Sequence, residues 1–352
     1  MKKQEIEYPL GTRPEDGEVL EVRDGILWVR MPIPIKGLDY INLYLIEDDD
    51  GWTMIDSGFN SDKIKELWEK IFSKHLKGKP LTRLICTHFH PDHMGLAGWV
   101  TERWNIPLTM TFGEWTFGRM LYLEAAEETP EHVIDFYQAV GFSEETLARV
   151  KSRGFNHFHR AMTPVPMGFN RIADGSIISI GKRDWKIIVG CGHSPEHACL
   201  YSAEDGLLIS GDQVLPRITP HIGVYPAEPL ANPLKQFIQS IDIYKNLPED
   251  TLVLPAHNDV FYGLHNQLDY YQSHHMERLN RLKSACTKPQ SAIDLLPVLF
   301  DRELSQSDTG LAISEGLAHC HYLVDEGELD RQRGTDGIWR FQRQKAIQAA
   351  VA

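Results

Sequence analysis

The chain has 352 residues, 42% of them hydrophobic and 24% charged, which are ordinary values for a globular protein of about two domains. The formal net charge of −13 disfavours a nucleic-acid partner. The five cysteines are scattered and fit a reducing compartment. No apolar run reaches the ~18 residues of a membrane span, and no apolar core follows the first lysines as in a secretory signal. We therefore expect a cytoplasmic protein.

The first part of the chain predicts an α/β arrangement. Residues 17–58 are rich in β-formers, and the turn Asp48-Asp49-Asp50-Gly51 between two apolar runs predicts a hairpin. Apolar residues at helical spacing follow from Ile64 to Ile71. A short strand at 81–87 then precedes a helix at about 94–104. Strands that alternate with helices in this way are typical of α/β folds.

The middle of the chain combines a helical insert with a second β-rich region. Residues 112–160 read as helical, with breaks near Pro130, Gly141 and Gly154. We expect this insert to cover the functional edge of the sheets as a lid, or to form ordinary core or a dimer face. The predicted strands of the second region lie within 175–190, 198–212 and 251–257, with a helix at about 232–246.

The last ninety residues change in character. A long helix at 265–286 is followed by helical segments at 291–300 and 309–324 and by a hairpin around Thr335-Asp336-Gly337. Three helices and a hairpin describe a winged-helix-like domain. Its predicted recognition stretch is acidic, which does not suit DNA binding, so we expect a packing role or a homodimer contact.

The stretch Thr87-His88-Phe89-His90-Pro91-Asp92-His93 contains the strongest chemical signal. Imidazole and carboxylate groups are the preferred ligands of Zn²⁺ and similar divalent ions. On an extended segment, His88 and His90 point to the same side. Asp92 and His93 follow where the loop turns into a helix, so they can face a second position nearby.

Three further candidates follow predicted strands in the second β-rich region. His193, Asp212 and His257 each stand where loops collect functional groups at a strand end. Together with the histidine loop they give seven ligands, enough for two divalent metal ions. Zn²⁺ is the expected metal, with Mn²⁺ and Fe²⁺ as alternatives.

These motifs carry a family resemblance. The loop T-H-F-H-P-D-H, then G-H-S-P-E-H, S-G-D and P-A-H, together with the Asp56-Ser57-Gly58 turn, resemble the metallo-β-lactamase-fold hydrolases, in particular the glyoxalase II and lactonase-like branch. The resemblance covers about residues 20–262 and implies an αββα sandwich. It places a catalytic domain at 1–262 and a winged-helix-like domain at 263–352.

The resemblance also implies a role for each ligand. The first metal would be held by His88, His90 and His193, the second by Asp92, His93 and His257, with Asp212 bridging both. Asp56 would lie behind the ligands and orient the histidine loop.

The implied chemistry is hydrolysis of a small molecule. Two such ions lower the pKa of a shared water, and the metal-bridging hydroxide would attack a carbonyl carbon while Asp92 and Asp212 move protons. The leading substrate is a thioester of the acyl-glutathione or acyl-CoA type. A lactonase is the alternative, and a metal-dependent endoribonuclease is the alternative from another class.

Candidate substrate residues lie in the segment that follows Asp212. Tyr225 is expected to hydrogen-bond a developing oxyanion, as a tyrosine does in related thioesterases and lactonases. Arg217 and His221 are candidate substrate contacts, with Arg217 as an anchor for an anionic group. The string His157-Phe158-His159-Arg160 is interpreted as loop histidines near the site entrance.

Overall fold

A computed structural model describes residues 6–34, 37–155, 157–301 and 306–344. The chain forms two compact units. The first contains the described residues of Met1–Ala125, Asn156–Pro220 and Ser240–Asp269. The second contains Ala126–Phe155 and the described residues of His221–Gln239 and Tyr270–Ala352. The second unit thus gathers three separate stretches of the chain, and the two units are described separately below.

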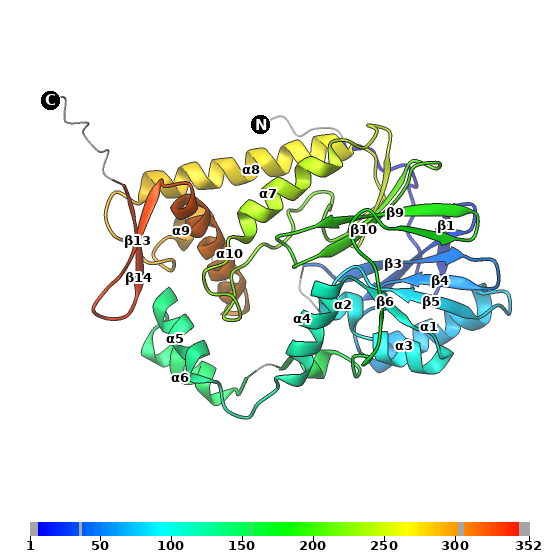
Figure 1. Cartoon of the computed structure of the whole chain (residues 1–352), viewed down its shortest axis with the longest axis horizontal. Coiled ribbons are helices and arrows are strands. Elements are labelled where there is room, and N and C mark those ends of the chain that lie inside the picture. The colour runs from blue at the N-terminus through cyan, green and yellow to red at the C-terminus, as the bar shows by residue number, and fades with distance from the viewer. Residues whose placement is uncertain (1–5, 35–36, 156, 302–305, 345–352) are drawn as a thin grey trace. The chain divides into compact units, whose positions relative to one another are not determined.

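Two mixed β-sheets form the centre of the first unit (Figure 1). The first sheet has its seven strands in chain order, from β1 to β7. These strands are β1 Val19–Arg23, β2 Ile26–Pro32, β3 Tyr40–Glu47, β4 Trp52–Ile55, β5 Leu81–Ile85, β6 Leu108–Met110 and β7 Asn170–Arg171. The second sheet has the order β12-β11-β10-β9-β8. Its strands are β8 Ile177–Ile180, β9 Arg183–Gly190, β10 His197–Ser202, β11 Leu207–Gly211 and β12 Leu252–Pro255.

Alternating side chains of the first sheet fill two separate cores. In β2, Ile26 and Trp28 belong to a cluster that also contains Trp185 and Ile187 of β9, so this core lies between the sheets. Leu27, with other residues of the opposite face of β2, belongs to a cluster that contains residues of the helices. Because β2 is buried on both faces, the first sheet is an inner layer of the fold.

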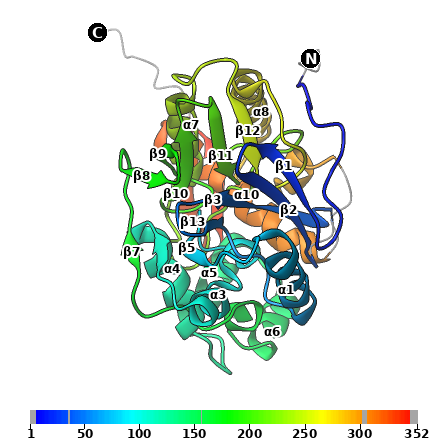
Figure 2. The ribbon, with the colours of Figure 1, turned by 90° about the vertical axis from the view of Figure 1, so that its right-hand side faces the viewer.

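Helices cover the outer faces of both sheets, as Figure 2 shows for α1 and α3 on the first sheet. The helices of this layer are α1 Asp62–His75, α2 Pro91–Met94, α3 Ala97–Trp104, α4 Phe112–Leu123 and the 3₁₀ helix η1 His157–Ala161. Ser61 caps α1 by accepting a hydrogen bond from the Ile64 N–H. On the second sheet, the Tyr244 hydroxyl at the end of α7 (Pro233–Tyr244) lies 3.1 Å from the Cys199 sulfur of β10. The first unit is therefore an αββα sandwich, as predicted.

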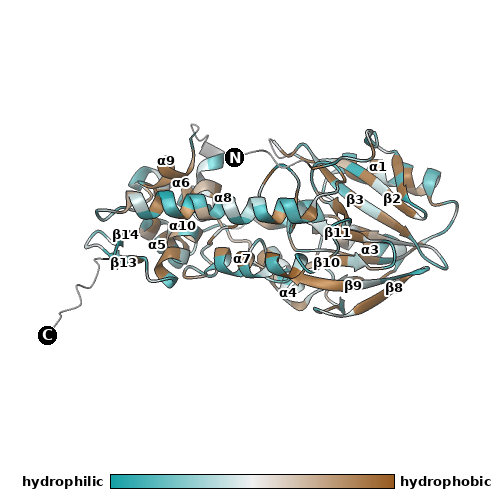
Figure 3. Ribbon diagram, turned by 90° about the horizontal axis from the view of Figure 1, so that it is seen from above, coloured by the Kyte–Doolittle hydropathy of each residue, from teal (hydrophilic) through white to brown (hydrophobic). Residues whose placement is uncertain are grey.

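The second unit combines helices with one hairpin. Its elements are α5 Glu131–Val140, α6 Glu144–Ser152, α9 Leu296–Leu299, α10 Gln306–Asp325, β13 Leu329–Arg333 and β14 Trp339–Arg343, with parts of α7 and of α8 Leu264–Ala285. Figure 3 shows α8 as mostly hydrophilic along its length. Phe136 of α5 contacts the Trp339 ring of β14 edge-on, with a centroid separation of 6.2 Å. The α5–α6 part of the predicted insert is therefore packed inside this unit.

Most predicted elements are confirmed, and the differences have local causes. The predicted helix at 291–300 is wrong in length: only Leu296–Leu299 is helical, because Pro297 lacks an N–H and is accepted only in a first helical turn. The helix expected at about 94–104 is α3 Ala97–Trp104, and the separate short helix α2 Pro91–Met94 precedes it. The predicted order of three helices and a hairpin at the C-terminus is present. None of the described helices is both long enough and apolar enough to cross a membrane.

Candidate metal centre

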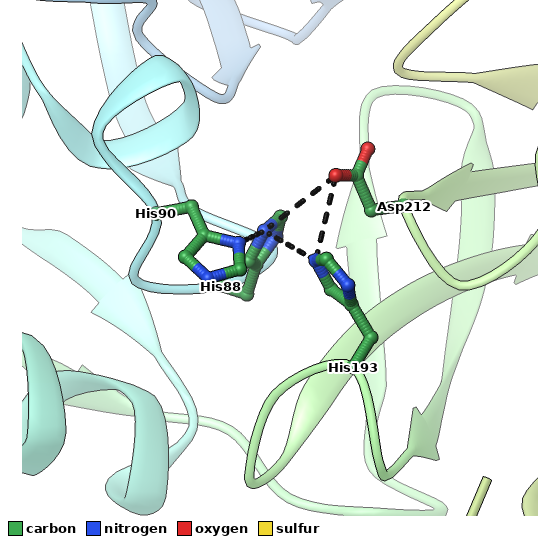
Figure 4. Close-up of side chains that lie close together, drawn as sticks. All are labelled: His88, His90, His193 and Asp212. Atoms are coloured by element: carbon green, nitrogen blue, oxygen red, sulfur yellow. Dashed lines mark hydrogen bonds and ion pairs between the residues drawn. The ribbon is translucent and has the colours of Figure 1, made fainter. Parts of the chain in front are cut away.

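Four ligand groups converge at one edge of the two sheets (Figure 4). His88 Nε2 lies 2.9 Å from His90 Nδ1 and 3.2 Å from His193 Nε2. The Asp212 carboxylate closes the group, with Oδ2 3.4 Å from His193 Nε2. Ligand atoms bound at ~2.0–2.1 Å around a tetrahedral ion are about 3.3 Å apart. The spacing of these four groups therefore fits one metal position.

Three further groups form a second cluster next to the first. His257 Nε2 lies 3.3 Å from Asp92 Oδ2, and His93 Nε2 lies 3.6 Å from the same oxygen. The other Asp212 oxygen, Oδ1, lies 3.4 Å from His257 Nε2 and 3.5 Å from His93 Nε2. Asp212 thus presents one oxygen to each cluster. The two clusters make up a candidate dinuclear site, with the residues grouped as the family resemblance implies.

Three buried polar atoms at the second cluster, one of them Asp212 Oδ1, are placed as ligands of a cation would be. Among the residues that the structure describes, the buried atoms His93 Nε2, Asp212 Oδ1 and His257 Nε2 have no hydrogen-bond partner. A buried polar atom without a partner costs free energy. These three atoms lie within 3.5 Å of one another in two pairs, so one ion between them would satisfy all three. The residues therefore fit a bound divalent metal.

Asp56 holds the histidine loop from behind. One carboxylate oxygen accepts from the Thr87 N–H at 2.7 Å, and the other accepts from the Thr87 hydroxyl and from His93 Nδ1, both at 2.8 Å. Asp56 has φ 58°, a left-handed conformation that is uncommon for a residue other than glycine. With Nδ1 engaged, Nε2 of His93 is left for the metal position.

Hydrogen bonds also fix the orientation of two other ligands, His257 and Asp212. His257 Nδ1 donates to the Tyr40 carbonyl oxygen at 2.9 Å, which leaves its Nε2 for the metal position. The backbone N–H of Asp212 donates to Nε2 of the buried His197 at 3.0 Å. Nδ1 of His197 lies 3.6 Å from the Cys199 sulfur. His197 is therefore a positioning residue for Asp212.

Gly211 allows Asp212 to approach His197. It has φ 50°, and a Cβ at this position would lie 2.5 Å from His197 Cε1 and 3.1 Å from the Thr87 hydroxyl oxygen. A side chain would force the ring out of place. The glycine of the S-G-D motif is thus explained by close packing.

A buried carboxylate joins the two ligand loops. Glu114 of α4 accepts from the Phe89 N–H at 3.0 Å, and from the Ser194 hydroxyl and the Glu196 N–H, both at 2.7 Å. Phe89 belongs to the histidine loop, and the other two follow His193. Burial raises the pKa of Glu114 to about 7 against these three hydrogen bonds.

The charges of the centre are distributed unevenly. Burial, together with the neighbouring imidazoles, holds the pKa of His88 well below its ordinary value, so this ring is neutral. Burial opposes the ionisation of Asp212, but His257 and His93 hold the pKa of its carboxyl well below the usual range. Burial also disfavours a charged His93, yet the carboxylates of Asp212, Asp92 and Asp56 raise its pKa above the ordinary value. Without a metal, the centre therefore holds protons that an ion displaces.

Sequence reasoning did not assign a role to Glu114 or His197. His197 is the last residue of the G-H-S-P-E-H motif, two positions before a buried cysteine on a strand, so its burial was readable from the strand pattern. Glu114 stands in the aromatic start of the insert, and no local signal marks it.

The other candidate residues occupy different places. Arg217 belongs to the first unit, where its Nε donates to the Tyr8 hydroxyl oxygen at 2.9 Å and its Nη2 lies 3.3 Å from Asp259. Tyr225 and His221 belong to the second unit and are joined by a 2.8 Å hydrogen bond. Arg217 therefore belongs to the first unit, and Tyr225 and His221 belong to the second.

The histidines at 157 and 159 lie in η1 and not in an open loop, which corrects that expectation. A contact with the metal loop comes from the residue between them, since the Phe158 ring lies 5.9 Å from the Phe89 ring.

A sandwich that presents seven candidate His and Asp ligands at one edge of its sheets has the make-up of a metal-binding protein. Residues 37–257 match the model of the Metallo-beta-lactamase superfamily, and residues 279–344 match the Metallo-beta-lactamase-like, C-terminal domain. The chain belongs to the metallo-beta-lactamase superfamily.

Two similar proteins cover most of the chain, and a third covers about half of it. The crystal structure of a beta-lactamase domain protein from Burkholderia ambifaria is 39% identical, with a TM-score of 0.90 over 96% of this chain and 98% of that one. "Probable metallo-hydrolase YqjP" of Bacillus subtilis is 23% identical over 86% of this chain and 93% of the relative. "Acyl-coenzyme A thioesterase MBLAC2" of Homo sapiens is 24% identical over 54% of this chain and 64% of the relative.

Proposed function

We propose that this protein is a dinuclear metal-dependent thioesterase that cleaves the acyl group from a small-molecule carrier. The observation that carries this proposal is the pair of ligand clusters that share Asp212, each oxygen of which faces one cluster. Two adjacent ions suit attack of water on a carboxylic ester or thioester. Zn²⁺ is the proposed metal, because imidazole and carboxylate are among its usual ligands.

The residues around the clusters would divide the work. When bound, the two ions supply a Lewis acid for the carbonyl oxygen and make a water molecule acidic enough to act as nucleophile near neutral pH. Asp92 and Asp212 accept the proton of the attacking water and return it to the leaving sulfur. Asp56 and Tyr40 hold the rings of His93 and His257 in one tautomer, so their Nε2 atoms stay available.

Two features support a thioester as the substrate. The Asp92-His93 pair in the histidine loop resembles the dinuclear pattern of thioesterases and lactonases, whereas the main subclass of zinc β-lactamases lacks it. A relative that matches 54% of this chain is named an acyl-coenzyme A thioesterase. Lactones pass through the same tetrahedral intermediate and form the second candidate class.

The polar pair His221–Tyr225 is proposed to assist the substrate. The 2.8 Å hydrogen bond between His221 Nε2 and the Tyr225 hydroxyl fixes the rotation of the phenol. When His221 Nε2 is the donor in this bond, the single O–H of Tyr225 is left to donate to a developing oxyanion. If the proposal is right, Tyr225→Phe lowers kcat about 10-fold or more with little change in metal content.

The test is turnover on a panel of acyl-CoA, acyl-glutathione, lactone and single-stranded RNA substrates, with metal content measured on the same sample. We expect thioester turnover with about two metals bound, and its loss in Asp92→Ala together with one equivalent of metal. Asp62→Ala, on the exposed start of α1, is the matched control. Turnover of RNA with inert esters and thioesters would overturn the proposal.

A further inference from the structure

A cavity of about 390 Å³ lies in the first unit beside the chain segment that carries His257. The lining residues that bear on its chemistry are Tyr8, Arg13, Trp28, Arg217 and Asp259. Asp259 follows the ligand His257 by two positions, and Arg217 follows Asp212 by five. The cavity is called the arginine pocket below.

The pocket carries an excess of positive charge. Arg13 makes a bidentate ion pair with Asp259, in which Nη2 lies 2.6 Å from Oδ2. Arg217 reaches the same carboxylate at 3.3 Å. Although burial opposes ionisation of Asp259, Arg13, Arg217 and Arg30 together lower its carboxyl pKa. Asp259 is the one carboxylate among the described lining residues, and Arg13 and Arg217 are the arginines among them, so two guanidiniums share a single negative charge. In a chain with net charge −13, this local reversal favours an anionic ligand.

The pocket also holds a donor that lacks a partner. Trp28 is 1% exposed, and among the described residues its indole Nε1 has no hydrogen-bond partner. The guanidinium groups add only further donors. The Asp259 carboxylate and the Tyr8 hydroxyl oxygen already accept from Arg13 and Arg217, so a ligand rich in oxygen atoms would supply the acceptor that the Trp28 N–H lacks.

The walls of the pocket are held in place. Glu7 pairs with Tyr262 through two backbone hydrogen bonds of 3.3 and 2.9 Å, which fixes the segment of Tyr8. The Tyr8 ring lies under the Arg217 guanidinium, with Cζ 4.4 Å from the ring centroid. Arg217 has φ 70°, a left-handed conformation that costs energy for a residue with a side chain. Strain of this kind is concentrated at functional positions.

We propose that the arginine pocket binds a phosphate group of the acyl carrier, and so directs the metal centre to phosphorylated thioesters of the acyl-CoA type. This inference rests on the proposed function. The excess positive charge favours an anion, and guanidinium forks bind phosphate oxygens in pairs. The volume falls within the range of small-molecule sites, ~300–1,000 Å³, and exceeds what a single carboxylate occupies.

Direct binding is the first test, on the full-length metal-loaded chain. The probe is desulfo-CoA, because without a thiol it lacks the group that would ligate the metals. We expect Arg13→Gln and Arg217→Gln each to weaken its binding about 10-fold in calorimetry. Arg103→Gln, an exposed arginine paired with Glu69, is the matched control and should leave binding unchanged. Equal binding by all four proteins would overturn the inference.

Kinetics provide the second test and separate the two proposals. For an acyl-CoA, both pocket variants should raise KM about 10-fold with kcat little changed. The same acyl group on N-acetylcysteamine has no phosphate, so all variants should cleave that substrate equally. Equal losses on both substrates, or a loss confined to acyl-glutathione, would contradict a phosphate subsite while leaving the thioesterase proposal intact. Absence of thioester turnover with desulfo-CoA binding still sensitive to Arg217 would overturn the thioesterase and retain the subsite.

Discussion

Asp56 shows how one side chain outside the ligand set controls the metal centre. Its carboxylate accepts from three donors, two of them on Thr87 and the third on the His93 ring. Removing the negative charge while keeping the shape weakens this anchoring and makes the His93 ring a poorer ligand. The site therefore depends on a residue that touches no metal position.

We predict that Asp56→Asn lowers the affinity for the second metal by about 10–100-fold, a typical loss when the partner of a ligating histidine is changed. Competition with a chromogenic chelator measures the affinity. Asp62→Asn, whose side chain is 96% exposed on α1, serves as control. An unchanged affinity in Asp56→Asn would show that His93 is oriented by other contacts.

Glu114 gives the protein a pH-dependent component of stability. Its folded-state pKa is about 7, raised by burial above a usual value of 4.5. Between these two values the folded state binds more protons than the unfolded state, so this component of stability is present below about pH 4.5 and is lost as the pH rises through 7.

Glu114→Gln should remove that dependence. The free energy of unfolding of the wild type relative to this variant is expected to fall by up to about 3 kcal/mol between pH 5 and pH 8. Denaturant unfolding of chelator-treated protein at both pH values measures the difference. Parallel stability profiles for the two proteins would mean that Glu114 is already ionised at pH 5.

The metal ligands can be predicted from the sequence, whereas the residues that position them mostly cannot. The histidine loop is local, so its spacing predicts four ligands directly, and His193, Asp212 and His257 stand at predicted strand ends. Glu114 is different, because it acts through Phe89, 25 residues before it, and Ser194, 80 residues after it. Contacts of that range depend on the tertiary fold, and a single sequence shows no trace of them.

At the scale of elements, apolar spacing predicts the long strands and helices but misses the shortest ones. β6 has three residues and β7 has two, too few for a period of two to emerge. α9 is shorter than predicted because Pro297 restricts where a helix can begin. These errors leave the αββα order intact, since the missed strands add to one edge of the first sheet.

α3 packs so closely that it requires a glycine. A Cβ on Gly98 would lie 2.0 Å from the Pro164 carbonyl oxygen, which belongs to the backbone and cannot rotate away. We predict that Gly98→Ala destabilises the protein by about 1–3 kcal/mol, the usual cost of overpacking. Thermal unfolding measures the change. Gly168→Ala is the control, because no atom of the described residues lies within 4 Å of the added Cβ; equal melting temperatures for the two variants would refute this account of α3.

At the scale of the whole molecule, the metal centre joins the two sheets of the first unit. His88, His90, Asp92 and His93 follow β5 of the first sheet. The remaining ligands flank strands of the second sheet: His193 precedes β10, Asp212 follows β11 and His257 follows β12. A bound ion therefore links the two halves of the sandwich and binds the folded state in preference to the unfolded state.

Metal removal should consequently lower the stability of the whole sandwich. With free Zn²⁺ at about 100 times its dissociation constant, we expect a stabilisation of about 2.7 kcal/mol relative to chelator-treated protein, reversed when the ion is restored. Because the carboxylates around His93 raise its pKa in the metal-free protein, binding should also release protons, which calorimetry in buffers of different ionisation enthalpy detects. Asp212→Ala should show neither the stabilisation nor the proton release. A melting temperature that is indifferent to chelator in the wild type would mean that the sheets are held together without the ions.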